Sequence, residues 1–337
     1  YNGARFREVT LNNQQAPPGD YEELTTVREN DYLLPMVHLQ LKPTEWFKLR
    51  LARTETLTRP DFNQYAPITR INSYQSYIRA ANSQLKPARA VNYDASMSIY
   101  QSKVGLFSAN LFYKEIDDLI FQVRYYLREG IEPLPGFNIP EQWYQGASPL
   151  VDTYENNPFE TTYKGYELSW QTNFWFMPSF LQGLVLDVNF SRIFSETTKR
   201  QYQLVQDGVI EGSWPPQPKW VVKDTSRIAR MPDQPKYVAN LTLGYDYKGF
   251  SARVSYLYQT DKVSYIARVP ELDQFTETYA RWDLALKQRF PEGFEVFANL
   301  NNINNRKDRS NIGNVGDKPT FIENYGFTMD LGVRFSF

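Results

Sequence analysis

The sequence has no cysteine and a single histidine, His38, in 337 residues. Without thiolates the chain cannot form a disulfide framework, a thiolate zinc site, an iron–sulfur cluster or a cysteine nucleophile. One imidazole leaves little room for a histidine-rich metal site or a histidine-based proton relay. The other residues show no better catalytic constellation, so we expect no metal, no cofactor and no catalytic residue, and a protein that is not an enzyme.

An excess of charge of either sign is also missing. Basic residues number 37 and acidic residues 38, which gives a formal net charge of -1. A nucleic-acid-binding protein needs a basic surplus to displace counterions, so nucleic acid is excluded as a partner. No segment approaches the ~18 consecutive apolar residues of a membrane helix. Residues 1–30 also contain no basic stretch followed by an apolar one, so we expect no signal peptide there.

Aromatic residues, by contrast, are abundant. The chain contains 24 Tyr, 22 Phe and 7 Trp, although its mean hydropathy is only -0.55. Apolar and polar residues alternate along segment after segment, which is the period-2 pattern of β-strands with two different faces. This pattern predicts about eleven strands, near 36–42, 45–53, 91–99, 105–114, 164–176, 184–192, 237–246, 250–258, 278–290, 293–301 and 327–337.

The connections between these strands alternate between short and long. The long ones fall near 58–89, 127–160, 197–234, 267–275 and 303–325. Bacterial outer-membrane barrels have this arrangement, with short periplasmic turns, long extracellular loops, and strands that are apolar toward lipid and polar toward the lumen. The sequence thus predicts an all-β transmembrane antiparallel barrel over residues 34–337, in contact with outer-membrane lipid.

An odd number of strands does not close a bacterial single-chain barrel. We therefore expect residues 1–33 to be an extracellular loop, with Arg5 to Leu11 as the top of a partial twelfth strand. On this interpretation the chain is incomplete at its N-terminus.

Several segments together resemble one protein family. They are LLPMVHL at 33–39 with TLTRPDF at 56–62, LKP at 85–87 with NYD at 92–94, FYKEIDDLI at 112–120, NLNNI at 299–303 and GVRFSF at 332–337. In this order they are similar to the C-terminal barrel portion of TonB-dependent outer-membrane receptors, in the style of Bacteroidota members such as SusC-like proteins.

The resemblance implies the C-terminal half of a 22-stranded barrel around a plug domain. Neither the plug nor the segment that contacts TonB is expected in this chain. It further implies active import of a scarce solute across the outer membrane of a Gram-negative bacterium. TonB would act through the plug segment, and a surface lipoprotein of the SusD type is a candidate partner.

The last strand carries the pattern of an outer-membrane assembly signal, with polar Asp330, Gly332 and the aromatic residues Phe335 and Phe337. Its unpaired edge and aromatic row could be recognised by the barrel-insertion machinery before closure. The simpler interpretation is that both phenylalanines face lipid.

Aromatic residues in the predicted extracellular loops are candidates for binding a substrate or a partner. Flat rings suit sugars, peptides or aromatic chelates, whereas the simpler interpretation is loop packing or contact with a lid protein. The candidates are Tyr125, Tyr126, Trp143, Tyr144, Trp214 and Trp220.

Other functions stay open at this stage. The barrel could be a structural or assembly component of a larger outer-membrane complex, with loops that contact protein. It could also be a stand-alone porin or outer-membrane enzyme of about twelve strands. A soluble all-β binding module is a more distant alternative.

Overall fold

The computed structural model describes residues 3–6, 24–27, 31–66, 69–72, 77–127, 149–291, 293–313 and 319–335. Eleven long strands in these residues form one continuous antiparallel sheet, which confirms the strand count from the sequence. In chain order they are β3 (Met36–Thr44), β4 (Phe47–Thr58), β7 (Ala88–Gln101), β8 (Gly105–Asp117), β11 (Thr161–Asn173), β12 (Leu184–Lys199), β16 (Tyr237–Tyr247), β17 (Phe250–Gln259), β20 (Tyr279–Arg289), β21 (Phe294–Asn301) and β24 (Thr328–Phe335).

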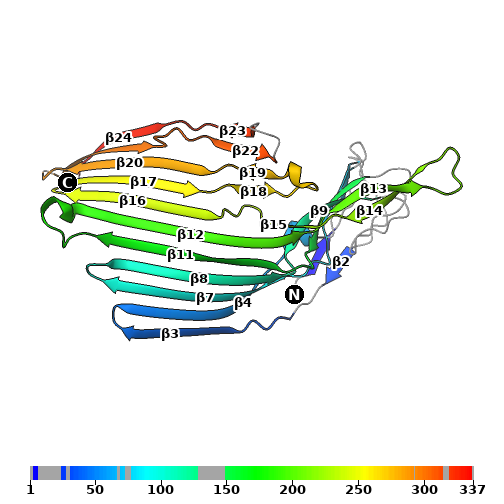
Figure 1. Cartoon of the computed structure of the whole chain (residues 1–337), viewed down its shortest axis with the longest axis horizontal. Coiled ribbons are helices and arrows are strands. Elements are labelled where there is room, and N and C mark those ends of the chain that lie inside the picture. The colour runs from blue at the N-terminus through cyan, green and yellow to red at the C-terminus, as the bar shows by residue number, and fades with distance from the viewer. Residues whose placement is uncertain are drawn as a thin grey trace.

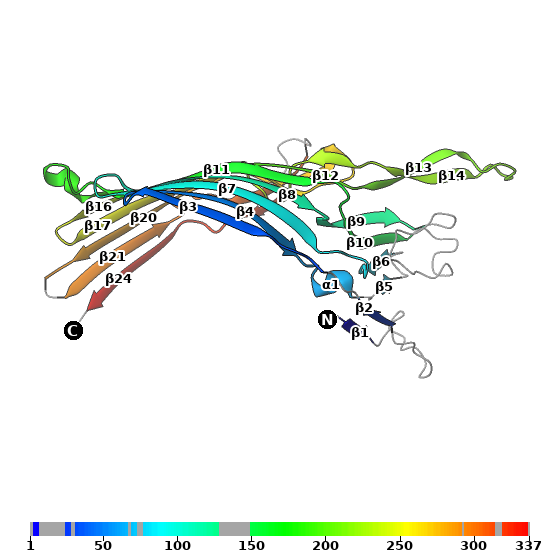
Figure 2. The same ribbon diagram turned by 90° about the horizontal axis from the view of Figure 1, so that it is seen from below.

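Each long strand pairs with the next one along the chain, from β3 at one edge to β24 at the other. The short connections, such as 45–46 and 248–249, gather at one end of the sheet, and the long ones leave the opposite end (Figure 1). We call these the turn end and the loop end. The sheet is strongly curved, as a segment of a barrel wall would be (Figure 2).

Hydrogen-bonded registers place residues of one kind in rows across the sheet. One row is apolar in eight successive strands, from β4 to β20: Phe47, Ile99, Phe107, Trp170, Val188, Leu241, Tyr256 and Trp282. The adjacent row, on the opposite face, is polar at all positions but one: Lys48, Ser98, Ser108, Ser169, Asn189, Asn240, Leu257 and Arg281. The sheet therefore has one apolar and one polar face.

Side chains on the polar face bond to one another across strands. Gln171 Nε2 donates to Asp187 Oδ2 over 3.1 Å, and the hydroxyls of Thr242 and Ser255 lie 3.0 Å apart. His38 lies on this face beside Gln40, opposite Ala52, as the alternation predicts. A polar face of this kind suits contact with water or with a polar domain.

The loop end has structure of its own. A four-stranded sheet combines β5 (Thr69–Asn72), β6 (Tyr77–Ala80), β10 (Leu150–Asn156) and β9 (Ile120–Tyr126), and a second combines β18 (Lys262–Tyr265), β19 (Gln274–Thr276), β22 (Asp308–Ile312) and β23 (Pro319–Glu323). The hairpin of β13 (Tyr202–Val209) and β14 (Pro218–Asp224) extends away from the wall, and β15 (Arg227–Ala229) pairs with the end of β12 (Figure 1).

Short elements complete the fold. They are β1 (Gly3–Phe6), which pairs with β2 (Leu24–Val27) in a separate two-stranded sheet, the helix α1 (Phe62–Tyr65), and the 3₁₀ turns η2 (Ser179–Gly183) and η3 (Pro270–Leu272). Among the described residues, no helix has the length and apolar content that crossing a membrane would require.

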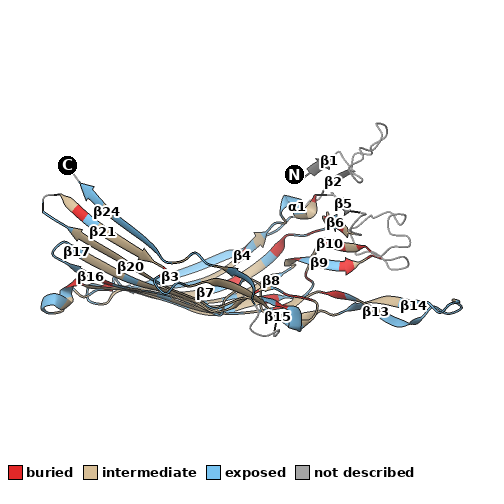
Figure 3. Ribbon diagram, turned by 90° about the horizontal axis from the view of Figure 1, so that it is seen from above, coloured by how far each residue is buried: buried red, intermediate tan, exposed pale blue. Residues whose placement is uncertain are grey.

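A hydrophobic core of buried residues lies at the loop end and not under the large sheet. It consists of Ile78, Ala80, Tyr125, Leu127, Val151 and Tyr202, and Val222 of β14 packs against it. The long strands are mostly half-buried or exposed, as Figure 3 shows by colour. This distribution is expected where lipid covers the apolar face of a wall.

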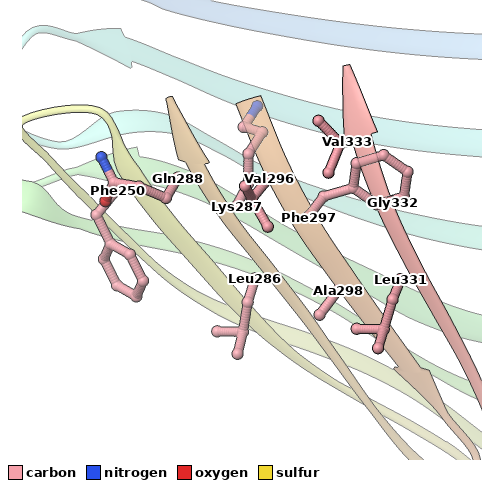
Figure 4. A pocket seen from close by; sticks show the side chains of 10 residues that line it. All are labelled: Phe250, Leu286, Lys287, Gln288, Val296, Phe297, Ala298, Leu331, Gly332 and Val333. Atoms are coloured by element: carbon pink, nitrogen blue, oxygen red, sulfur yellow. The ribbon is translucent and has the colours of Figure 1, made fainter. Parts of the chain in front are cut away.

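Three glycines on the polar face lie beneath large cross-strand side chains. A Cβ added at Gly165 would lie 2.8 Å from the ring of Phe112, and one at Gly244 would lie 2.7 Å from the guanidinium of Arg253. A Cβ at Gly332 would overlap the ring of Phe297, which lies opposite on β21. Figure 4 shows Phe297 beside Gly332, within a cavity of about 420 Å³ near the edge of the sheet.

This contact gives Gly332 a packing role in the folded protein. Asp330 lies opposite Asn299, and the ring of Phe335 lies 5.3 Å from that of Phe294. Phe337 lies outside the described residues. The assembly signal therefore stays a prediction, and Gly332 now has a second physical explanation.

A double-mutant test separates the two explanations of Gly332. We expect Gly332→Ala to destabilise the barrel by about 1–3 kcal/mol, because the new methyl group overpacks the site. Phe297→Ala in the same chain should restore most of the loss. The measurement is the unfolding temperature of the full protein in detergent, which is read from the change of its gel mobility on heating. No rescue would mean that Gly332 is needed for another reason, such as insertion.

Candidate functional site

A buried carboxylate links three strands of the β5–β6–β10–β9 sheet. Asp152 of β10 is 3% exposed. Its oxygens accept hydrogen bonds from the Tyr77 hydroxyl at 2.7 Å, from Gln122 Nε2 at 2.5 Å and from Arg124 Nε at 3.2 Å. Burial and the bond to Asp152 raise the pKa of the Tyr77 hydroxyl. A buried carboxylate needs this many donors to offset its lost hydration.

A cavity of about 190 Å³ opens beside this cluster, at the unpaired edge of β9. Residues from three separate connections line it: β9, residues 199–201 together with Pro232, and residues 264–266 together with Arg268. Four cationic side chains line it, namely Arg124, Lys199, Arg200 and Arg268. None of the described residues that line the cavity is acidic.

Lys199 is held at the edge of β9 by a backbone carbonyl and an aromatic ring. Its Nζ donates to the backbone carbonyl of Gln122 over 2.5 Å and lies 4.3 Å from the centre of the Phe121 ring. No described carboxylate comes within ion-pair distance of it. Burial lowers the pKa of this amine to about 8.

The arginines differ in how well they are neutralised. Arg124 pairs with Asp152 at 3.2 Å, whereas Nε of Arg200 is 3.5 Å from Glu155 Oε1, an oxygen for which the described residues supply no hydrogen bond. Burial raises the pKa of the Glu155 carboxyl despite the nearby cations. Arg268 lies 5.1 Å over the Tyr126 ring. The cavity therefore has a positive excess.

Polar contacts fix the walls of the cavity. Gln201 is 7% exposed, and its Nε2 donates to the carbonyls of Ile266 and Ala267 at 3.1 and 2.7 Å. Asp273 accepts from the backbone N–H of Ala267 over 2.8 Å and pairs with Arg227. The segment that carries Arg268 is thus tied both to the end of β12 and to the turn η3.

The aromatic candidates from the sequence are spread over the loop end. Tyr125 is only 4% exposed and packs in the core against Tyr202, and Tyr126 is half-buried beneath Arg268. Trp214 is 91% exposed beyond the end of β13, whereas Trp220 lies half-buried on β14 opposite Gln206. Trp143 and Tyr144 lie outside the described residues. The described candidates do not form a common binding surface.

Sequence reasoning missed the cationic cavity. Its charges come from positions 124, 199, 200 and 268, which only the folded loops bring together. One local signal was available, because Lys199 and Arg200 are adjacent where β12 ends. Such a pair could equally be a solvated strand end, so the sequence alone does not single it out.

Comparisons with known proteins agree with this architecture. A family model described as "TonB dependent receptor-like, beta-barrel" matches residues 3–303. The siderophore receptor PiuA of Acinetobacter baumannii is 15% identical, with a TM-score of 0.59 over 93% of this chain and 37% of that chain. No curated protein matches the sequence.

Two further solved structures share the fold. The ferric enterobactin receptor PfeA of Pseudomonas aeruginosa, in a mutant form, is 15% identical, with a TM-score of 0.57 over 90% of this chain and 40% of that chain. The hemophore receptor HasR of Serratia marcescens, in complex with its hemophore and heme, is 14% identical, with a TM-score of 0.59 over 94% and 41%. The chain thus spans about 40% of the length of these receptors.

The two-faced sheet and these likenesses define the fold as the wall of a β-barrel. The chain belongs to the family of TonB-dependent receptor β-barrels, since the family model covers most of it. That family consists of receptors and not of enzymes. Among the described residues, no group of three or more potential metal ligands comes together.

Removal of the buried carboxylate should loosen the β9–β10 unit selectively. We expect Asp152→Ala to cost this sheet about 1–3 kcal/mol, because Arg124, Tyr77 and Gln122 lose their shared acceptor. Limited chymotrypsin digestion of the full protein in detergent should then cut near Tyr125 and Tyr126 sooner. Asp207→Ala, on exposed β13, is the matched control. Equal digestion of both variants would contradict the role of Asp152.

Lys199 should react with an amine-selective acylating reagent at unusually low pH. At pH 8 about half of an amine with a pKa near 8 is neutral, against well under ~1% for an ordinary lysine with a pKa of about 10.4. The labelling rate at Lys199, followed by mass spectrometry, should therefore reach half of its maximum near pH 8. The exposed Lys219 and Lys223 serve as comparison sites. A rate that still rises steeply above pH 9 would contradict the lowered pKa.

Proposed function

We propose that the protein imports a scarce solute across the outer membrane with energy supplied through TonB. The observation that carries this proposal is the eleven-stranded wall, apolar on one face and polar on the other, in a chain of the receptor family. The loop end is extracellular in this proposal, because outer-membrane barrels have short turns in the periplasm. The chain then supplies barrel wall and substrate-facing loops.

The remaining parts of the transporter lie outside these strands in our proposal. The eleven strands make half of a 22-stranded barrel, and the plug and the TonB-contacting segment complete it. The polar face, with Lys48, Asn189 and Arg281 in one row, would border the plug and the path of the solute. The edge strands β3 and β24 would pair with the other half, because lipid cannot hydrogen-bond the backbone groups of an unpaired strand edge.

Iron chelates are the first solutes to test. The similar structures are named as receptors for ferric enterobactin, siderophores and a heme-carrying hemophore. A protein partner at the loop end is a second proposal, supported by the β13–β14 hairpin, which carries Trp214, 91% exposed, near its tip. A surface lipoprotein of the SusD type or a carrier protein would fit this position.

Uptake of labelled ferric siderophores and heme in matched strains tests the transport function. We expect a receptor-deficient host that carries the full gene to accumulate one of these solutes at least about tenfold faster than the same host without it, since the membrane otherwise excludes them. Deletion of TonB should abolish the gain. Uptake that persists without TonB would contradict the proposal and favour a passive porin.

A further inference from the structure

The cavity at the edge of β9 has the features of a preformed anion site. Arg124, Lys199, Arg200 and Arg268 reach it from three separate connections. Asp152 and Glu155, which partner two of these cations, are largely buried, with side chains 4% and 12% exposed. The four cationic side chains therefore line the cavity, whereas the carboxylates of Asp152 and Glu155 are buried away from it.

Two of the four cations have no carboxylate partner among the described residues. Lys199 contacts a carbonyl oxygen and the Phe121 ring, and Arg268 contacts the Tyr126 ring. Cations in such settings have exchanged part of their hydration for weak contacts, so an incoming anion gains more from them than from solvated ones. Charge-assisted hydrogen bonds to carboxylate or phosphate oxygens are among the stronger polar contacts in proteins.

Neighbouring side chains can orient a ligand that the cations attract. Tyr265, 42% exposed, lines the cavity together with Phe121 and offers a flat surface for a ring or chain of the ligand. Gln201 also lines it, and its buried Oε1, an acceptor with no hydrogen-bond partner in the described residues, can accept from a hydroxyl or N–H group that the ligand carries beside its oxyanion. Ser264 brings a hydroxyl. The site can therefore recognise oxyanion groups beside an apolar or aromatic part.

The size of the cavity limits what enters it. Pockets for drug-sized ligands measure about 300–1,000 Å³, whereas this one holds about 190 Å³. It fits one acidic group of a larger molecule or a small polyanion. The bonds of Gln201 and Asp273 hold its walls in place, which lowers the ordering cost of binding.

We propose that this cavity captures the oxyanion group of an acidic solute, such as a carboxylate or phosphate, at the loop end of the barrel. The proposal rests on the proposed import function and names the chemistry that the first extracellular contact selects. The same oxyanion chemistry occurs in the phosphates of lipopolysaccharide. We favour the solute because β9 and β18, which carry lining residues, lie beyond the ends of the neighbouring long strands (Figure 1).

The test measures binding of citrate and of pyrophosphate to the full receptor in detergent by titration calorimetry. We expect both probes to bind, and more weakly at higher salt because charge is screened. The double variant Lys199→Gln/Arg268→Gln removes the two cations without carboxylate partners and should weaken binding by about tenfold or more. The matched control, Lys219→Gln/Lys223→Gln, removes two exposed charges from β14 and should bind as the wild type does.

A second arm separates the two sources of oxyanion. Purified lipopolysaccharide is titrated into the same protein, and its binding is compared between wild type and the Lys199→Gln/Arg268→Gln variant. Binding of lipopolysaccharide without binding of citrate or pyrophosphate would overturn the proposal in favour of a lipid headgroup. Equal binding of the probes by both double variants, or no binding of them by the wild type, would also overturn it.

These outcomes are independent of the transport proposal. Binding in detergent requires neither TonB nor a membrane. Loss of uptake in the TonB deletion with unchanged anion binding in vitro supports both proposals. TonB-independent uptake together with anion binding at the cavity would overturn only the import mechanism, whereas TonB-dependent uptake without such binding would overturn only the anion site.

Discussion

The rest of the structure depends on the requirement that every backbone N–H and C=O in a bilayer be paired within the protein. An antiparallel ladder meets this requirement and leaves the side chains free to differ on its two faces. The register is then locked, because a slip by one residue would exchange the row that begins at Phe47 with the row that begins at Lys48. The fixed register also places Gly165, Gly244 and Gly332 next to large side chains of neighbouring strands, and the missing Cβ leaves room for those side chains.

This constraint explains how much of the fold the sequence could predict. Two different solvents on the two faces impose strict alternation, so the expected strand 250–258 agrees with β17 (Phe250–Gln259) within one residue. Predictions ended too early where a strand continues beyond the apolar band, as in β12 (Leu184–Lys199), expected only to residue 192. The four-residue strand β6 went unseen, because its buried Ile78 and Ala80 form no long periodic pattern.

The candidate site was much less predictable. Aromatic residues were visible as a class, but burial separates Tyr125 in the core from Trp214 in solvent, and burial is a property of the folded loops. The cationic cavity required Arg124 and Arg268 to meet across 144 positions of sequence, through connections whose pairing follows from their own small sheets. Alternation carries information about the wall, whereas loop contacts depend on particular partners such as Asp152 and Gln201.

The wall and the loop end are stabilised by different interactions. The wall is stabilised by lipid on one face and by ladders within, so its sequence can repeat one simple pattern over eleven strands. The loop end has no lipid and must use a conventional core, around Ile78, Val151 and Tyr202, to hold functional groups in place. That core permits an unfavourable arrangement, in which Lys199 loses hydration without a direct ion pair to a described carboxylate. An anion that enters the cavity can pair with this amine. The free energy lost when Lys199 was desolvated is then partly regained as binding free energy for the ligand.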